Sequence, residues 1–285
     1  MGFFVFKSAL IKDWLRDISI LRNREFDDED GIVIFFKDLS IESIHPQHIA
    51  SLACLLEYWY KKNLRNVSID SNSPVGEYLF NKLNIQMYWS GDQNFADSNN
   101  PNILNLWRIK DEEKEVHGRR VSQYLKQNYF QNKDLSSVEN SLTEAYYNIF
   151  DHAQAEGNAF TMLEYDERKG VLHVAVCDFG IGIAKSVQNY LENGIDDKSA
   201  LAKAIEANFT IKSASYNAGQ GLSNIIDSCT ERDSVCICSN SAVLTIKGSR
   251  QAIKSVDYNF EGTLLFYSMA IYRFDEEETL DELIW

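Results

Sequence analysis

The apolar positions in the first part of the chain predict alternating strands and helices. Residues 31–36 form a continuous apolar run of strand length, and residues 67–70, with the sequence VSID, predict a short strand. Between them, apolar side chains recur at helical spacing over residues 46–65, and residues 75–83 predict a second helix. Strands that alternate with helices in this way predict a small α/β layer.

A polar segment rich in turn-forming residues follows this layer. Residues 90–101 read SGDQNFADSNNP and show no hydrophobic periodicity, which is typical of a linker or a long loop. We therefore predict a small α/β domain over residues 1–100 and a linker over residues 101–114. A second domain is expected over residues 115–273, followed by an acidic tail at 274–285.

The second half of the chain predicts a long helix and a largely antiparallel sheet. Residues 136–154 carry an apolar stripe at helical spacing. Residues 160–165 and 171–178 predict two strands joined by the hairpin turn DERKG. The remaining predicted elements are a helix and three strands, over residues 221–230, 235–238, 242–247 and 263–272. Helices packed on such a sheet make an α+β fold.

Composition limits the classes of function that the chain can serve. Hydrophobic residues make up 45% of the 285 residues, which supports a packed core and argues against disorder. The formal charge of -14 provides no basic stripe for a nucleic acid backbone, so we expect no nucleic acid partner. No run approaches the roughly 18 apolar residues of a membrane span. Five cysteines without a C-x-x-C pair fit a reducing compartment, and the expected location is cytoplasmic.

The first of three polar motifs lies on the predicted long helix. Glu144, Asn148 and His152 are spaced four residues apart, which places them on one polar line. An amide oxygen such as that of Asn148 can hold Mg²⁺ against phosphates, and Glu144 can orient or deprotonate an attacking hydroxyl or water. The alternative is a solvated helix face, and His152 suits a structural hydrogen bond as well as a phosphate contact.

The second motif closes a predicted strand. Asp178 is followed by Gly180, Gly182 and Ile183 in the sequence DFGIGI. A carboxylate accepts a hydrogen bond from an exocyclic amine, which adenine has and guanine lacks at that position. The two glycines would let the backbone approach a base and a sugar without a Cβ atom in the way. By itself this D-x-G-x-G pattern is found as often in a turn as in a site.

The third motif opens a predicted helix with Gly219, Gln220, Gly221 and Leu222. The free N–H groups and the positive dipole end of such a helix attract an anion. The 36 residues between Gly182 and Gly219 are too long for a plain connection and predict a lid. Within them, Lys212 is a candidate phosphate contact, and the alternative is an ordinary surface lysine.

In this order and spacing, the three motifs resemble the N, G1 and G2 boxes of the GHKL family of ATPases and kinases. The closest likeness is to the bacterial anti-sigma serine kinases, over roughly residues 115–272. The resemblance implies a Bergerat-type α/β sandwich that binds ATP and Mg²⁺. It also implies that Asp178 reads adenine with support from Thr263, and that the other residues of the three motifs bind the nucleotide or act on it.

A second resemblance concerns the N-terminal region. Residues 36–44 and the helix after them are similar to a STAS domain, the fold of anti-sigma antagonists. The loop that holds the phosphorylatable serine in those antagonists reads His45-Pro-Gln-His48 in this chain. A docking role is therefore expected here in place of a phosphorylation switch.

The expected function is that of a Mg²⁺-dependent ATP-binding protein. One activity is a serine/threonine protein kinase acting on a regulatory protein partner. The other is an ATPase whose lid closure drives dimerisation, which would make a homodimer, or partner binding. The alternative from another class is a non-catalytic interaction module in which the nucleotide only stabilises the fold. No membrane partner is expected.

Overall fold

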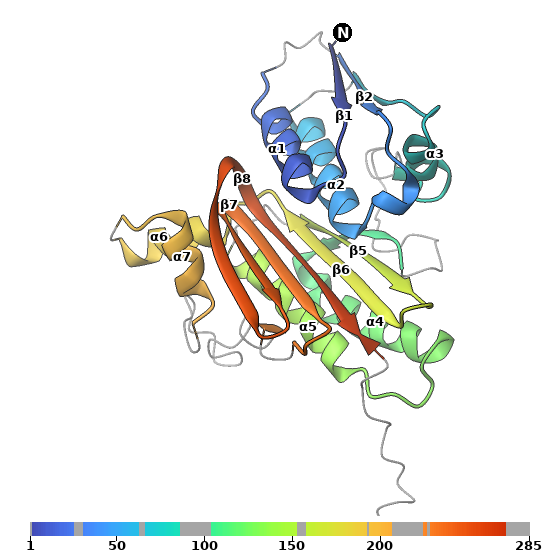
Figure 1. Cartoon of the computed structure of the whole chain (residues 1–285), viewed down its shortest axis with the longest axis vertical. Coiled ribbons are helices and arrows are strands. Elements are labelled where there is room, and N and C mark those ends of the chain that lie inside the picture. The colour runs from blue at the N-terminus through green and yellow to red at the C-terminus, as the bar shows by residue number, and fades with distance from the viewer. Residues whose placement is uncertain are drawn as a thin grey trace, which may run out of the picture.

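The computed structural model describes most of the chain and shows it as four layers (Figure 1). A three-stranded sheet is followed by a layer of two helices, then by a five-stranded sheet, and then by further helices. The chain is therefore an α+β protein, as the sequence predicts. The described residues are 2–25, 31–62, 66–85, 104–152, 158–192, 194–206, 225–226 and 229–271.

The N-terminal layer is built around a parallel sheet. Its strands are β1 (Gly2–Phe6), β2 (Gly31–Phe36) and β3 (Asn66–Ile69), in the order β1-β2-β3. Helix α1 (Ile11–Arg22) connects the first pair and α2 (Pro46–Lys61) connects the second. Parallel neighbours need such crossovers, and both helices pack on the inner face of the sheet.

The sequence pattern did not predict β1 or α1. Helix α1 carries charged side chains on its outer face, but Trp14, Leu15, Ile18 and Leu21 are buried along the other face. These four residues follow helical spacing, and the stripe is only 12 residues long, which is easily overlooked between polar positions.

The loop that resembles the STAS phosphorylation loop has a structural role at the start of α2. His45 is the N-cap residue, and its backbone N–H donates to Nδ1 of His48 at 3.0 Å. The other ring nitrogen of His48 lies 2.9 Å from the carbonyl oxygen of Ala9. Burial lowers the pKa of His48 to about 4, so this ring is neutral at physiological pH.

Helix α3 (Pro74–Asn81) completes the N-terminal layer, and the short helix η1 (Ile41–Ser43) precedes α2.

The second sheet is antiparallel throughout. Its strands are β4 (Leu106–Lys110), β5 (Asn158–Asp166), β6 (Val171–Asp178), β7 (Ser234–Lys247) and β8 (Arg250–Ala270). Their order in the sheet is β4-β5-β6-β8-β7. Strands β7 and β8 form one long hairpin, visible in orange and red in Figure 1.

Two features of this sheet differ from the sequence prediction. Residues 106–110, assigned to a linker, form the edge strand β4, in which Leu106 and Ile109 are almost fully buried. The polar segment before them masked this short alternation. The predicted strands 235–238 and 242–247 are one strand, because a bulge at Ser239 and Asn240 interrupts the pattern without ending the pairing.

Several helices cover the sheet face that lies away from the N-terminal layer. The short helix η4 (Asp111–Glu113) leads into α4 (Lys114–Asn128). The predicted helix 136–154 is α5 (Ser136–Tyr147) followed by η5 (Asn148–His152), a turn of π-helix. Strand β6 matches its prediction at both ends, and β5 extends two residues earlier and one residue later than expected.

Helices α1 and α2 share one hydrophobic core with the five-stranded sheet. Helix α2 contacts β5, β6 and β8, and α1 contacts β8. The sheet contributes Phe160, Met162, Ala175, Cys177 and Leu264 to this core. The other sheet face packs against α4, α5 and α6 in a second core. The five-stranded sheet is thus covered on both faces, and the strand ends and loops remain as places for a site.

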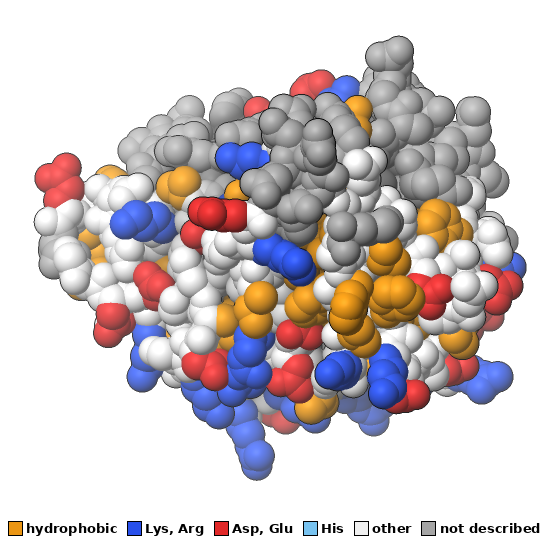
Figure 2. Space-filling model, turned by 90° about the horizontal axis from the view of Figure 1, so that it is seen from above, with side chains coloured by type: hydrophobic (Ala, Val, Ile, Leu, Met, Phe, Trp, Pro, Cys, Tyr) orange, Lys and Arg blue, Asp and Glu red, His pale blue; other side chains and the backbone are white. Residues whose placement is uncertain are grey.

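The outer face of the three-stranded sheet carries large apolar side chains. Phe3 and Val33 are register partners, as are Val5 and Phe35. Phe3 is 71% exposed and Phe35 is 36% exposed. Figure 2, which views the molecule from the end that holds the N-terminal layer, shows hydrophobic side chains gathered among charged ones.

Within the described ranges, no helix is both long and apolar enough to cross a membrane.

Candidate functional site

Two residues of the predicted site meet on neighbouring strands. Asp178 is the last residue of β6, and Thr263 lies directly opposite it on β8. Side chains alternate between the faces of a strand, so Asp178 lies on the same face as Val176, and Thr263 on the same face as Leu265. That face packs against α5, the helix that carries Glu144. The fold therefore brings the first and second motifs to one side of the sheet.

Both residues keep hydrogen-bonding capacity in a buried place. Asp178 is fully buried, and its Oδ1 accepts a hydrogen bond from the backbone N–H of Gly180 at 2.6 Å. Its Oδ2 has no hydrogen-bond partner among the described residues, and the same holds for the hydroxyl of Thr263. Buried polar atoms are nearly always paired, so two such atoms on facing residues indicate a place for a ligand or a water molecule.

The burial of Asp178 changes its acidity. Loss of solvent raises the pKa of its carboxyl group to about 7. The Gly180 N–H, the backbone and hydroxyl of Thr263, and the charge of Arg22 all act in the opposite direction. Thr263 is near enough to favour the charged form, although its hydroxyl does not have the geometry of a hydrogen bond to the carboxylate. A carboxyl group with this pKa changes its charge near neutral pH.

The helix of the first motif changes its geometry within the motif. Glu144 lies on α5, whereas Asn148 and His152 are the first and last residues of the π-helical turn η5. The motif therefore does not lie on one continuous α-helix as predicted, because the chain continues as a π-helix after Tyr147, which shifts the phase of the residues that follow. Such turns are frequent at functional sites. The side chain of His152 lies outside the described part of the structure.

Glu144 and Asn148 remain one turn apart. The side-chain Nδ2 of Asn148 donates to the carbonyl oxygen of Glu144 at 2.7 Å. This bond orients the side-chain amide, whose oxygen is the atom that can hold a cation. Partial burial raises the pKa of Glu144, which makes its carboxylate a better proton acceptor.

A buried polar network fixes the helix that carries these two residues. Nδ1 of His117 on α4 lies 2.9 Å from the hydroxyl of Tyr146, which donates to Thr161 Oγ1 on β5 at 3.2 Å. Burial lowers the pKa of His117 to about 3, so its ring is neutral. Tyr146 stands between Glu144 and Asn148 in the sequence, so this network anchors the motif to the sheet.

Gly182 allows close packing of the loop after Asp178. It has a φ of +84°, and a Cβ atom there would meet the Asn240 side chain at 2.5 Å. It would also meet the carbonyl oxygen of Gly262 at 2.6 Å and Ser239 Oγ at 2.7 Å. The sequence predicted an approach to a base and a sugar at this glycine. The structure gives it a packing role against the β7 bulge.

The bulge residues were not among the sequence candidates. Ser239 Oγ accepts from the N–H of Ala184 at 3.3 Å, and Asn240 Oδ1 accepts from that of Lys185 at 3.2 Å. Asn240 Nδ2 also donates to the carbonyl oxygen of Ile181 at 3.1 Å. These bonds cap the start of the next helix and hold the loop in place. Asparagine tolerates the φ of +53° found at Asn240. The residue type at this position is the only feature of the local sequence that could have pointed to the bulge.

The segment predicted to be a lid begins with two packed helices. Helix α6 (Ile183–Leu191) and α7 (Asp197–Ala204) contact each other and β7. Ile183 is buried in the second core, so its side chain serves packing. The predicted residues outside the described part of the structure are Lys212, Gly219, Gln220, Gly221 and Leu222.

A polar cavity lies on the other side of the Asp178–Gly182 loop. Its volume is about 570 Å³, and Phe179, Arg22, Lys185, Asp197 and Glu261 are among its lining residues. Phe179 contacts the core shared with the N-terminal layer, whereas Asp178 faces α5. The cavity and the Asp178 carboxylate are therefore separated by the loop.

The described residues contain no group of three or more His, Cys, Asp or Glu side chains that could hold a metal ion. A Mg²⁺ ion held by one side-chain amide and by phosphate oxygens does not require such a group, because magnesium keeps several waters. No protein-family model matches the chain, and a search of curated proteins found no match.

Proposed function

We propose that this chain is a Mg²⁺-dependent adenine-nucleotide-binding protein of the GHKL type, with a Bergerat-type sandwich over its second half. The observation that carries the proposal is the buried Asp178 carboxylate opposite Thr263, each with one oxygen that has no partner among the described residues. Oδ2 of Asp178 would accept a hydrogen bond from the exocyclic amine of adenine. The Thr263 hydroxyl would bond to a neighbouring atom of the same ring.

The first motif supports the phosphate end of such a site. Asn148 would hold Mg²⁺ through its amide oxygen, and the bond from its nitrogen to the carbonyl of Glu144 orients the amide. The ion supplies charge neutralisation at the phosphates when bound. Glu144 would take a proton from the attacking hydroxyl or water, and partial burial suits it to that role. The glycine motif at residues 219–222, Lys212 and His152 are proposed phosphate contacts.

Two activities follow from this arrangement. A serine/threonine protein kinase would transfer the phosphoryl group to a regulatory protein partner, and a STAS-like N-terminal layer would serve docking. An ATPase would release phosphate and use the nucleotide to control dimerisation or partner binding. The five free cysteines suit the proposed cytoplasmic location. In the non-catalytic alternative, the nucleotide would only stabilise the fold.

Thermal melting with ATP, ADP and GTP, each with Mg²⁺ or EDTA, tests the proposal. Adenine nucleotides should raise the melting temperature, whereas GTP should not. At a nucleotide concentration one hundred times Kd, the free energy of unfolding should increase by about 3 kcal/mol. An equal response to ATP and GTP would contradict adenine reading by Asp178. No response to any nucleotide would contradict the proposal as a whole.

Labelled ATP then separates the activities. Label transferred to a candidate partner indicates a kinase, and free phosphate alone indicates an ATPase. Binding without either product favours the non-catalytic module.

A further inference from the structure

Arg22 connects the N-terminal layer to the loop that holds Asp178. It is the last residue of α1, and its side chain is 9% exposed. The guanidinium group lies over the ring of Phe179 at 4.4 Å and over that of Tyr58 on α2 at 5.0 Å. A largely buried cation is attracted electrostatically to each of these two rings.

The same guanidinium group also binds the backbone of the loop and of β8. Its NH2 group donates to the carbonyl oxygen of Phe179 at 3.4 Å and lies 3.2 Å from Glu261 Oε2. Its NH1 group donates to the carbonyl oxygen of Glu261. Arg22 therefore contacts α2, β8 and the loop at once, although it lies 156 positions before Asp178 in the sequence.

The carbonyl group of Phe179 belongs to the same peptide unit as the Gly180 N–H. That N–H donates to Asp178 Oδ1 at 2.6 Å. A cation at the carbonyl end of a peptide polarises the unit and strengthens its N–H as a donor. The guanidinium group of Arg22 thus contacts the Phe179–Gly180 peptide, and this peptide contacts the carboxylate of Asp178. The contacts lead from one face of the sheet to the other.

We propose that Arg22 is a positioning residue for the carboxylate of Asp178, through which the N-terminal layer controls how strongly the adenine ring is bound. The inference rests on the proposed function, because it concerns the same carboxylate. It assigns the N-terminal layer a direct effect on nucleotide affinity in addition to docking.

The charges around Asp178 give the proposal a measurable signature. The charged group that acts on Asp178 from the N-terminal side is Arg22, and the charge of Asp178 itself acts on the nearby thiols of Cys54 and Cys177. Burial raises the pKa of both thiols, so they stay neutral over the range of interest. Arg22 lowers the pKa of Asp178, and Glu261 partly neutralises Arg22. Adenine binding needs the ionised carboxylate, so affinity should fall as the pH decreases through the pKa of Asp178.

The experiment measures ATP affinity by calorimetry between pH 5.5 and 8.5 for the whole chain and its variants. Arg22→Gln should move the midpoint of the pH dependence upward by about 0.5 to 1 unit and so weaken binding about two- to fivefold near pH 7. Glu261→Gln should move the midpoint downward, because it leaves the cation without its acidic neighbour. Arg22→Lys keeps the charge and should leave the midpoint near that of the parent, although it loses the two-point contact.

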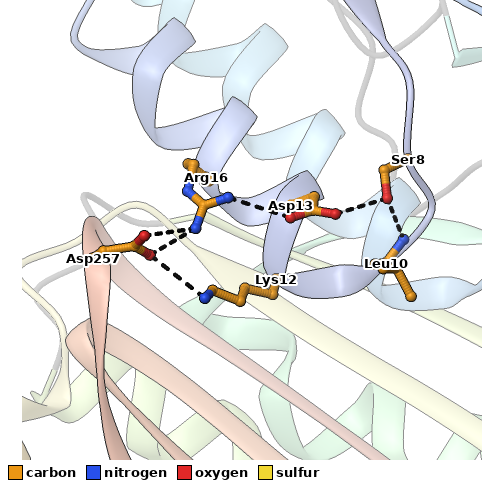
Figure 3. A network of polar contacts seen from close by, with 6 residues as sticks. All are labelled: Ser8, Leu10, Lys12, Asp13, Arg16 and Asp257. Carbon is orange, nitrogen blue, oxygen red and sulfur yellow. Dashed lines mark hydrogen bonds and ion pairs between the residues drawn. The ribbon is translucent and has the colours of Figure 1, made fainter.

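Arg16→Gln is the matched control. Arg16 is also on α1 and also joins it to β8, through Asp257 at 2.7 Å, and its other ion pair is with Asp13 on its own helix (Figure 3). This variant should bind ATP like the parent at every pH. Melting temperatures identify any variant that fails to fold. If Arg22→Gln does not fold, Glu261→Gln still tests the inference, because it alters only a half-exposed side chain.

The outcomes separate the inference from the function on which it rests. If Arg22→Gln and Glu261→Gln both keep the parent midpoint, Arg22 does not act on Asp178 and the inference is overturned. A loss of affinity that is equal at all pH values would give Arg22 a structural role only, and would also overturn it. If the parent chain binds no ATP at any pH, the proposed function itself fails.

Discussion

Asp178 and Thr263 lie opposite each other on neighbouring antiparallel strands, and each keeps one buried oxygen without a partner among the described residues. Leaving such atoms unpaired costs about 1–3 kcal/mol each. A folded chain tolerates this cost where a ligand completes the bonds. These two residues are therefore the strongest indication of a binding site at the end of β6.

Asp178→Asn should weaken ATP binding by about 1–3 kcal/mol, roughly 5- to 150-fold, and leave the fold intact. An amide can present an N–H group where the exocyclic amine needs an acceptor. Calorimetry on the folded variant measures the change, and binding of the parent provides the reference. Unchanged affinity would remove Asp178 from adenine recognition.

The same variant should change how stability depends on pH. The pKa of Asp178 is raised to about 7 in the folded state, compared with about 3.9 in an unfolded chain. The protonated carboxyl group therefore adds to the free energy of unfolding of the parent, and this contribution is full below pH 4. It is lost as the pH rises through 7, and the loss is at most about 4 kcal/mol. The free energy of unfolding of Asp178→Asn, relative to that of the parent, should therefore increase between pH 4 and 7. Denaturant titrations would show parallel curves if Asp178 kept an ordinary pKa.

Asn148→Ala should weaken nucleotide binding in Mg²⁺ much more than binding in EDTA. The variant loses the proposed cation ligand and keeps the contacts to the base. Titrations with and without the metal, on one preparation, give both values. Equal losses would indicate a disturbed helix, since the side chain also bonds to the carbonyl of Glu144.

Glu144→Gln should reduce turnover about 10²- to 10⁴-fold while ATP affinity holds or rises slightly. Glutamine has nearly the same size but cannot take a proton from the attacking group. Phosphate release and phosphotransfer are measured on the preparation used for binding. A variant that turns over ATP like the parent would exclude Glu144 as the base.

Gly182→Ala should lower the free energy of unfolding by about 2 kcal/mol or more. The change combines a φ of +84° with close contacts to Asn240, Ser239 and Gly262. Gly194→Ala is the matched control, because Gly194 has a φ of +66° but no atom within 4 Å of its Cβ position. That variant should lose about 1 kcal/mol, from backbone strain alone. Equal losses in the two variants would mean that the packing of Gly182 is unimportant.

The sequence by itself determined the α+β class, most of the elements and the presence of Glu144, Asn148 and Asp178 at particular points on them. Strand β6 could be predicted from Val171 to Asp178 because a hairpin turn precedes it and a continuous apolar run defines it. Such signals depend on consecutive residues, so they can be read before the chain is folded.

Only the tertiary structure decided which distant residues meet. The bulge at Ser239 and Asn240 and the contact of Arg22 with Phe179 have no signature in local periodicity, and the pairing of the short strand β4 at the sheet edge could not be read from its five residues. Each depends on how two surfaces pack, and packing joins residues whose separation along the chain carries no regular pattern. The burial that raises the pKa of Asp178 arises in the same way, because α5 and the N-terminal layer exclude water from the end of β6 together.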